Sequence, residues 1–242
     1  VILAIMTLSI GYTVAQSCGS CRVSSYNYLR YGELDKAKEQ SDFCITCDKN
    51  KSNPVVWWYR GQIYQNIHIN KEFQSLDPNA AVMAFESYKK ALVYNFVNPE
   101  LQKLDIENNE ADLLKFFSAI MDQKTKFVNS EMLVDIIMNQ FPSLANIFVN
   151  KGVDAFQKEK DYKTAYDFFS RSLFISSMSG KIDTPVVYYS ALAAQKAKLL
   201  KEAKESFKLL TKLEYGKDDK EKAANYYFLA DVYKESGDTA KY

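Results

Sequence analysis

Several residue types on which common enzyme activities depend are rare or missing. The chain has one histidine, His68, and no G-x-S-x-G, P-loop or dinucleotide-binding glycine pattern. Ser-His-Asp chemistry would depend on His68 alone, and a single histidine without nearby cysteines or clustered carboxylates is typical of a solvated loop residue. The acidic stretch ENNEAD at 107–112 is interpreted as a polar helix start, with catalytic carboxylates as the alternative. We expect no enzyme activity and no cofactor.

Net charge and turn-forming residues are also scarce. The 31 basic and 30 acidic side chains leave a net charge of +1, so no positive excess is available to hold a polyanion. Nucleic acid is therefore not an expected partner. Only 8 Gly and 5 Pro stand against 17 Tyr and 15 Phe, which disfavours a turn-rich all-β fold and favours a well-cored helical one.

The first fifteen residues, VILAIMTLSIGYTVA, contain no charge and end in small residues just before Gln16. They resemble the apolar core and cleavage region of a secretory signal peptide and are shorter than the ~20 residues that would span a bilayer. We interpret 1–15 as a signal-peptide remnant, with a buried N-terminal helix as the alternative. The mature chain is then exported, has no transmembrane span, and can keep disulfides.

A period of 38 residues indicates stacked helical hairpins. The segments that begin at Val149 and Val187 align without gaps, and three pairs in them are 38 positions apart: Phe156 and Ala194, Ala165 and Ala203, and Phe169 and Phe207. Each unit has two apolar runs at three-to-four spacing, separated by a short polar turn. We expect hairpin turns near Gly32, Lys160, Leu199 and Ser236, and buried small residues at Ala165 and Ala203.

The pattern resembles the tetratricopeptide repeat, W-x2-L-G-x2-Y…A-x3-F. The matching residues are Trp57, Gly61, Tyr64, Ala84 and Tyr88, then Gly152, Phe156, Ala165 and Phe169, then Ala191, Ala203 and Phe207, and last Tyr226, Ala230 and Tyr233. The resemblance covers about two-thirds of the chain. It implies an all-α solenoid of stacked antiparallel hairpins, of the type found in exported bacterial envelope proteins.

This resemblance divides the chain into parts. Residues 16–50 are expected to form a first hairpin with both cysteine pairs, and 51–98 a second hairpin with an inserted loop at 65–79. Residues 99–145 match no repeat but contain the helix-patterned stretches LLKFFSAIMDQ and SEMLVDIIMNQF, so we expect an irregular helical linker pair. Residues 146–242 then hold repeats three and four and a truncated fifth.

All four cysteines lie in two CxxC motifs that flank a predicted hairpin centred on Gly32 and Glu33. In an antiparallel hairpin, the position numbers of two residues that face each other add up to a nearly constant value. The numbers of Cys18 and Cys47 add up to the same value as those of Cys21 and Cys44. Residues three apart also share one face of a helix. The four sulfurs should therefore meet as two adjacent rungs at the open end of the hairpin.

Two chemistries fit these four sulfurs. In an oxidising compartment we expect disulfides from Cys21 to Cys44 and from Cys18 to Cys47, each worth roughly 3 kcal/mol on the chain-entropy account. The second is a four-cysteine zinc site, for which two CxxC motifs are a strong signal. An oxidoreductase motif at CGSC and a lipid anchor on Cys18 are further alternatives, although no βαβ pattern supports the former.

In tetratricopeptide proteins the first helices of successive repeats line a concave groove that binds ligands. Carried over by position, the resemblance assigns to this groove Arg22, Tyr26, Trp58, Gln62, Asn150, Asp154, Tyr188, Leu192, Tyr227 and Asp231. Such a mixture of aromatic and polar side chains suits a peptide, and packing between repeats is the alternative role of the aromatic residues. Some family members bind the C-terminal carboxylate of a chaperone through Lys and Asn residues of the groove. This sequence lacks that set, because Asn150 and Asp154 occupy the corresponding positions of the third repeat.

The sequence thus predicts a non-catalytic protein- or peptide-binding scaffold of a bacterial cell envelope, either periplasmic or associated with the outer membrane. The alternative is an envelope thiol-redox or zinc protein that uses the four cysteines.

Overall fold

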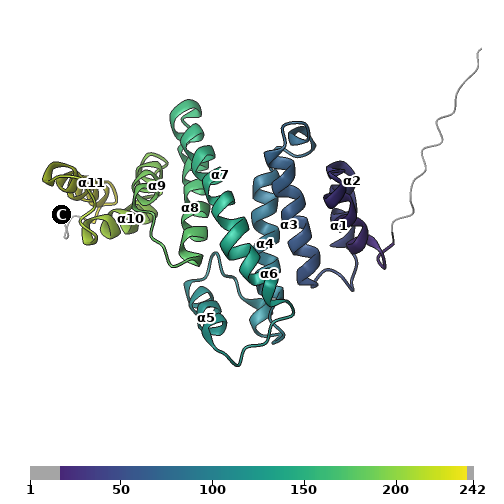
Figure 1. The fold of residues 1–242 in the computed structure, drawn as a ribbon. Coiled ribbons are helices and arrows are strands. Elements are labelled where there is room, and N and C mark those ends of the chain that lie inside the picture. Colours follow the sequence, from purple (N-terminus) through teal and green to yellow (C-terminus); the bar gives the residue numbers. More distant parts are fainter. Residues whose placement is uncertain (1–16, 239–242) are drawn as a thin grey trace, which may run out of the picture.

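The computed structural model describes residues 17–238, and every regular element in them is helical (Figure 1). The expected signal-peptide remnant, 1–15, lies outside the described residues. The helices are α1 (Cys21–Tyr31), α2 (Leu34–Cys44), α3 (Pro54–Ile69), α4 (Ala80–Tyr94), α5 (Glu110–Met121), α6 (Ser130–Asp135), α7 (Phe141–Asp154), α8 (Tyr162–Met178), α9 (Thr184–Lys196), α10 (Leu200–Lys212) and α11 (Asp219–Glu235). The prediction of an all-α fold is confirmed.

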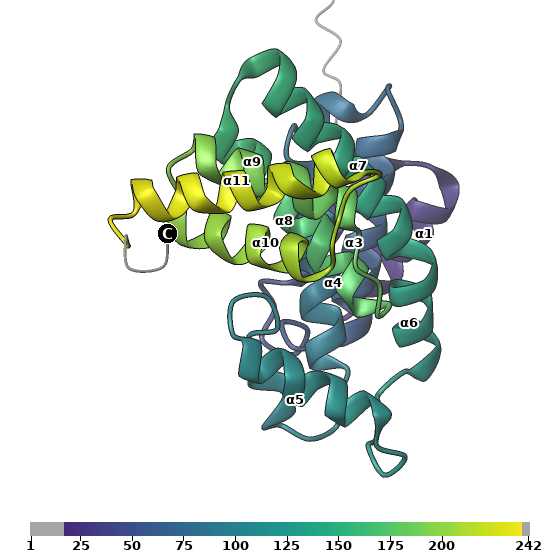
Figure 2. The same ribbon diagram turned by 90° about the vertical axis from the view of Figure 1, so that its left-hand side faces the viewer.

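Helices that follow one another in the chain pack as adjacent pairs. The pairs are α1 with α2, α3 with α4, α7 with α8, and α9 with α10. Each pair also contacts the next, through α2 and α3, α4 and α7, and α8 and α9, and α11 packs on α10. Figure 1 shows the pairs side by side in chain order, with α5 set apart below them. Figure 2 shows the same separation of α5 from a second direction.

Four turns share one backbone conformation. They follow α1, then the helix that contains α7, then α9, and last α11. A residue with positive φ follows the helix in each case: Gly32 at 74°, Lys160 at 56°, Lys198 at 61° and Gly237 at 74°. This left-handed conformation ends a helix and redirects the chain. The turns lie where the sequence predicts them, and Lys160 and Lys198 repeat its 38-residue period.

Small residues bring the paired helices close together. A Cβ atom added to Gly61 would lie 2.4 Å from the ring of Tyr88, and one added to Gly152 would lie 2.6 Å from the ring of Phe169. A larger residue therefore cannot stand at either position without displacing an aromatic ring. The expected burial of Ala165 and Ala203 is confirmed, since both are fully buried.

Two predicted boundaries are wrong. Residues 65–69, assigned to the inserted loop 65–79, form the last turn of α3 because Gln65 and Ile67 are buried. The second half of the predicted linker is not separate from the third pair. Instead α6 and α7 belong to one helix, Ser130–Glu159, which includes π-helical turns at Ile136–Gln140 and Ala155–Glu159.

The helix Ser130–Glu159 is long and apolar enough to cross a membrane, by length and composition only. Much of one side packs inside the helical stack, where Ile136, Leu144 and Phe148 are fully buried. The ring of Phe148 lies edge-on to that of Phe85 in α4, with centroids 5.6 Å apart. Packing between neighbouring pairs therefore accounts for part of its apolar composition.

Candidate functional site

The four cysteines lie together at the open end of the α1–α2 pair. Disulfides join Cys18 to Cys47 and Cys21 to Cys44, with Cα–Cα distances of 5.8 and 5.5 Å. The predicted pairing is confirmed. Each CxxC motif bonds to the other motif and not within itself, unlike the cysteine pair of an oxidoreductase. No cysteine of the described residues is free, so none of the four offers a thiolate to zinc or a thiol to a lipid.

Asn50 closes this disulfide end. Its side chain is buried, and its amide nitrogen donates to the carbonyl oxygen of Cys18 at 2.9 Å. The same nitrogen lies 3.2 Å from the sulfur of Cys21 and 3.3 Å from that of Cys44. Trp57 at the start of α3 donates from its indole nitrogen to the carbonyl of Lys51 at 2.7 Å. The disulfides and this loop together fix the first pair to α3.

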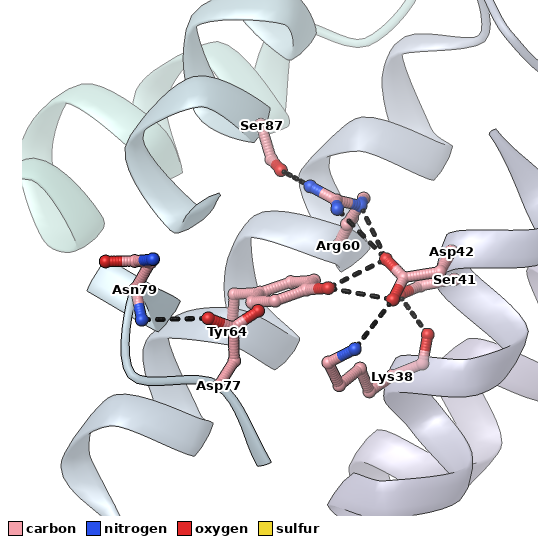
Figure 3. Close-up of polar contacts among 8 residues, drawn as sticks. All are labelled: Lys38, Ser41, Asp42, Arg60, Tyr64, Asp77, Asn79 and Ser87. Carbon is pink, nitrogen blue, oxygen red and sulfur yellow. Dashed lines mark hydrogen bonds and ion pairs between the residues drawn. The ribbon is translucent and has the colours of Figure 1, made fainter. Parts of the chain in front are cut away.

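A second link joins α2, α3 and α4 through a buried arginine (Figure 3). Arg60 is only 4% exposed, and its Nε and Nη2 atoms donate to one carboxylate oxygen of Asp42 at 3.1 and 2.9 Å. Its Nη1 atom donates to the hydroxyl of Ser87 at 2.8 Å. The hydroxyl of Tyr64 donates to the same Asp42 carboxylate at 2.8 Å, and burial raises the pKa of Tyr64 to about 12. This network positions the first pair against the second.

An aromatic column crosses the first helices of these two pairs. Tyr26 on α1 stacks on Tyr59 of α3 with ring centroids 4.9 Å apart, and Tyr59 stacks on Trp58 at 5.4 Å. The guanidinium of Arg30 lies 5.7 Å from the ring centroid of Tyr26 and continues the column. Two predicted groove residues, Tyr26 and Trp58, are thus brought together by Tyr59, which the sequence pattern did not identify. We call Arg30, Tyr26, Tyr59 and Trp58 the aromatic column.

The column ends at Asp135 on α6, where neutral donors surround a carboxylate. The indole nitrogen of Trp58 donates to it at 2.8 Å, and the amides of Gln62, Asn139 and Gln140 donate at 3.5, 3.0 and 3.1 Å. Within the described residues no lysine or arginine pairs with Asp135. Its negative charge is therefore stabilised by dipoles and not neutralised. The predicted residue Gln62 belongs to this cluster, whereas Asp135 was not predicted.

The remaining predicted residues form a separate group toward the end of the chain. Tyr188 on α9 lies with its ring centroid 5.9 Å from that of Tyr215, and Leu192 packs in the apolar cluster around it. Asp231 on α11 accepts from Gln195 of α9 at 3.4 Å. Tyr227 is 72% exposed.

Arg22 is exposed and lies near the aromatic column, where its charge opposes the rise that burial causes in the pKa of Tyr59. Two predicted groove residues take no part in either group: Asn150 is exposed, and Asp154 forms an ion pair with Lys158 at 2.8 Å on its own helix. The contacts of the other eight predicted residues gather them into two sets. They lie as one set around the aromatic column and Asp135, and another around Tyr188.

A cleft of about 330 Å³ between α4 and residues 102–108 was not predicted. Its lining includes the apolar side chains Leu104 and Ile106. Lys89 at its edge pairs with Glu86 and Glu107, and burial lowers the pKa of Lys89. A ligand site usually has a few polar groups that point into the pocket and are free to bind. The charges of Lys89, Glu86 and Glu107 are already paired with one another, so they do not serve in this way.

His68 lies in the last turn of α3 and not in the inserted loop where it was expected. It is partly buried, and burial together with the nearby charge of Lys151 lowers the pKa of His68. In the described residues no cluster of three or more His, Cys, Asp or Glu side chains is arranged to hold a metal ion.

Comparison of the sequence with protein-family models gives no match, and comparison with curated proteins gives none either. The two disulfides indicate an oxidising, exported compartment.

Proposed function

We propose that this chain is an exported, non-catalytic scaffold with a tetratricopeptide-like solenoid, which binds an extended segment of a partner protein across the first helices of its pairs. The periplasm or the outer membrane of a bacterium is the compartment that fits this role. Adjacent helical pairs, repeated turns 38 residues apart and small residues at close contacts support the solenoid.

The aromatic column and Asp135 carry the proposal. Tyr26 is 37% exposed, so the column offers an apolar aromatic edge to a partner while its rings are held in place by one another. Aromatic side chains fixed in this way anchor many protein interfaces at small entropic cost. Asp135 adds a partly exposed negative charge, with which no lysine or arginine of the described part of the chain forms an ion pair. The partner segment is therefore expected to present an apolar or aromatic residue close to a lysine or arginine.

A selection from a random 12-residue peptide library on the oxidised protein tests this function. We expect enriched peptides to combine a basic and an apolar residue, and to bind the Asp135→Asn and Tyr26→Ala variants at least about tenfold more weakly. Asp135→Asn removes the charge and keeps one acceptor oxygen for Trp58, while its amide nitrogen takes the place of the oxygen that accepts from Asn139. Tyr31→Ala is the matched control, because Tyr31 lies on the same helix, is 75% exposed and is outside the column. Enriched peptides that bind all variants equally, or no enrichment, would contradict the proposal.

The different-class alternative, a thiol-redox or zinc protein, requires free thiols at Cys18, Cys21, Cys44 or Cys47. All four sulfurs are bonded in pairs, so no observation favours it. Counting free thiols and bound metal in the native protein separates the two functions.

A further inference from the structure

The carboxylate of Asp135 is closed on the edge between its two oxygens. The side-chain nitrogen of Gln140 lies 3.3 Å from Oδ1 and 3.1 Å from Oδ2, so it donates to both and stands between them. Asn139 donates to Oδ1 at 3.0 Å, and the indole of Trp58 donates to Oδ2 at 2.8 Å. A carboxylate has about four acceptor positions. These contacts therefore occupy all of them, although Asp135 itself is partly exposed.

A local change in the helix places Gln140 over Asp135. In an ordinary α-helix, the neighbour one turn later is the residue four positions on, which here is Asn139. Residues Ile136–Gln140 instead form a π turn, in which backbone hydrogen bonds join residues five apart. The wider turn brings residue 140 close to residue 135 as well. Two consecutive amides thus reach the same carboxylate.

A buried tyrosine sets the orientation of the Gln140 amide. The hydroxyl of Tyr88 lies 3.2 Å from Oε1 of Gln140 and 2.9 Å from Oε1 of Gln65, and the Tyr88 side chain is fully buried. Its ring packs directly on Gly61 of α3, where an added Cβ atom would lie 2.4 Å from it. Because Tyr88 holds Oε1, the nitrogen of the Gln140 amide turns toward Asp135. A reversed amide would place oxygen acceptors against each other.

Arginine and lysine differ in what they require from a carboxylate. A guanidinium bonds a carboxylate best as a fork, with two parallel N–H groups on the two oxygens. Gln140 occupies that edge of Asp135, so the fork cannot form without displacing it. An ammonium is a compact, strongly hydrated charge that requires no pair of oxygens and can act through a bridging water. The site therefore keeps its attraction for a lysine and loses the contact that favours an arginine.

The aromatic column gives an arginine little in compensation. A guanidinium also binds the faces of aromatic rings. In the column, however, Tyr59 stacks with Tyr26 and with Trp58, and Arg30 of the chain itself lies 5.7 Å from the ring centroid of Tyr26. Since these ring contacts are already made within the protein, a second guanidinium gains less by stacking here.

We propose that the Asp135 site selects a lysine rather than an arginine of the partner segment, and that Gln140 determines this choice. The inference rests on the proposed function, because it concerns the basic residue of the same segment. The chain then discriminates between two cations of equal charge by the carboxylate positions that it leaves open. Gln140 is a specificity-determining residue that contributes no charge of its own.

Paired peptides test the choice. A peptide enriched by selection on the oxidised protein is synthesised twice, with its basic residue as lysine and as arginine, and both forms are titrated by fluorescence anisotropy. We expect the lysine form to bind about fivefold more tightly. Gln140→Ala opens the edge between the two oxygens, so the arginine form should gain relative to the lysine form and the preference should disappear or reverse. The ratio of the two affinities is the readout, since a loss of folded protein would weaken both forms equally.

Asn139→Ala is the matched control, because it removes a neighbouring donor from Oδ1 and leaves Gln140 in place, so the lysine preference should be retained. A selection without enriched peptides would contradict the proposed function, and this inference would fall with it. Peptides that bind but prefer arginine, or bind both forms alike, would overturn this inference alone. A lysine preference that persists in Gln140→Ala would show that Gln140 is not its source.

Discussion

The first helical pair and the α9–α10 pair have the same architecture but are held together differently. Among the buried residues of α1 and α2, Leu34 is the one large aliphatic side chain, and the others are cysteines or small or polar residues such as Ser25 and Ser41. Two disulfides and the Arg60–Asp42 network add to these contacts. The interface of α9 with α10 is apolar, with Val187, Phe207 and Leu210 buried. Where a helical pair buries little apolar surface, covalent and ionic links take the place of packing.

The largest expected effect follows from removing both disulfides. Replacing all four cysteines by Ala should destabilise the first pair by at least roughly 3 kcal/mol, because the unfolded segment then regains the freedom of the loop that the two disulfides close. The α9–α10 pair should be unaffected, since repeat stability is approximately a sum of local and neighbour terms. Urea unfolding followed by limited proteolysis measures both. Equal loss of both pairs would contradict the comparison.

Breaking the ionic link should have the next largest effect. Arg60→Met leaves the Asp42 carboxylate with fewer donors, and we expect a loss of about 2 kcal/mol, below the 3–5 kcal/mol of a fully buried pair because the Asp42 side chain is 33% exposed. Lys71→Met, at an exposed cation outside both this network and the aromatic column, is the control. Chemical denaturation measures the difference, and equal midpoints would show that the link does not hold the first pair.

Overpacking should affect the later pairs. Ala203→Leu and Ala165→Leu each insert bulk where two helices touch, and we expect losses of ~1–3 kcal/mol. Ala223→Leu, at an exposed position of α11, is the control and should stay within about 0.5 kcal/mol. An unchanged unfolding midpoint for both buried variants would remove the evidence that small residues set the helix spacing.

The link through Tyr64 predicts a dependence on alkaline pH. Its pKa is raised from 10 to about 12 in the folded protein, first by burial and then by hydrogen bonding to Asp42. The folded state therefore holds the proton more tightly than the unfolded state, so stability is present below pH 10 and falls as the pH rises from 10 to 12. Tyr64→Phe should flatten this fall, and Tyr31→Phe should not. Unfolding midpoints across that range provide the measurement.

The smallest effect concerns the turns. Lys160 and Lys198 adopt positive φ, which costs a residue with a side chain about 1 kcal/mol relative to glycine. Lys160→Gly should therefore stabilise the protein by up to about 1 kcal/mol, and Gly32→Ala should destabilise the first pair by a similar amount. Thermal unfolding that shows the opposite signs would contradict the shared turn.

Local patterns explain which features the sequence predicted. The turns and the cysteine pairing follow from the register of a single hairpin. Once its turn is located, the sequence separation from that turn determines which residues face each other. Asp135 could not be found in this way, because Trp58 is 77 residues away from it and the contact depends on how two pairs stack. The boundary near 145 was misplaced because residues 99–145 match no repeat, whereas the helix that begins at Ser130 runs on through a π turn and Pro142 to Glu159.

Amide hydrogen exchange of the oxidised and the reduced protein tests the contrast between the two pairs most directly. The amides of α1 and α2 should be protected when the disulfides are intact and should lose at least about tenfold of that protection on reduction, while those of α9 and α10 stay within about twofold. Protection in α1 and α2 that survives reduction would show that packing alone holds the first pair, and that the disulfides are not its clamp.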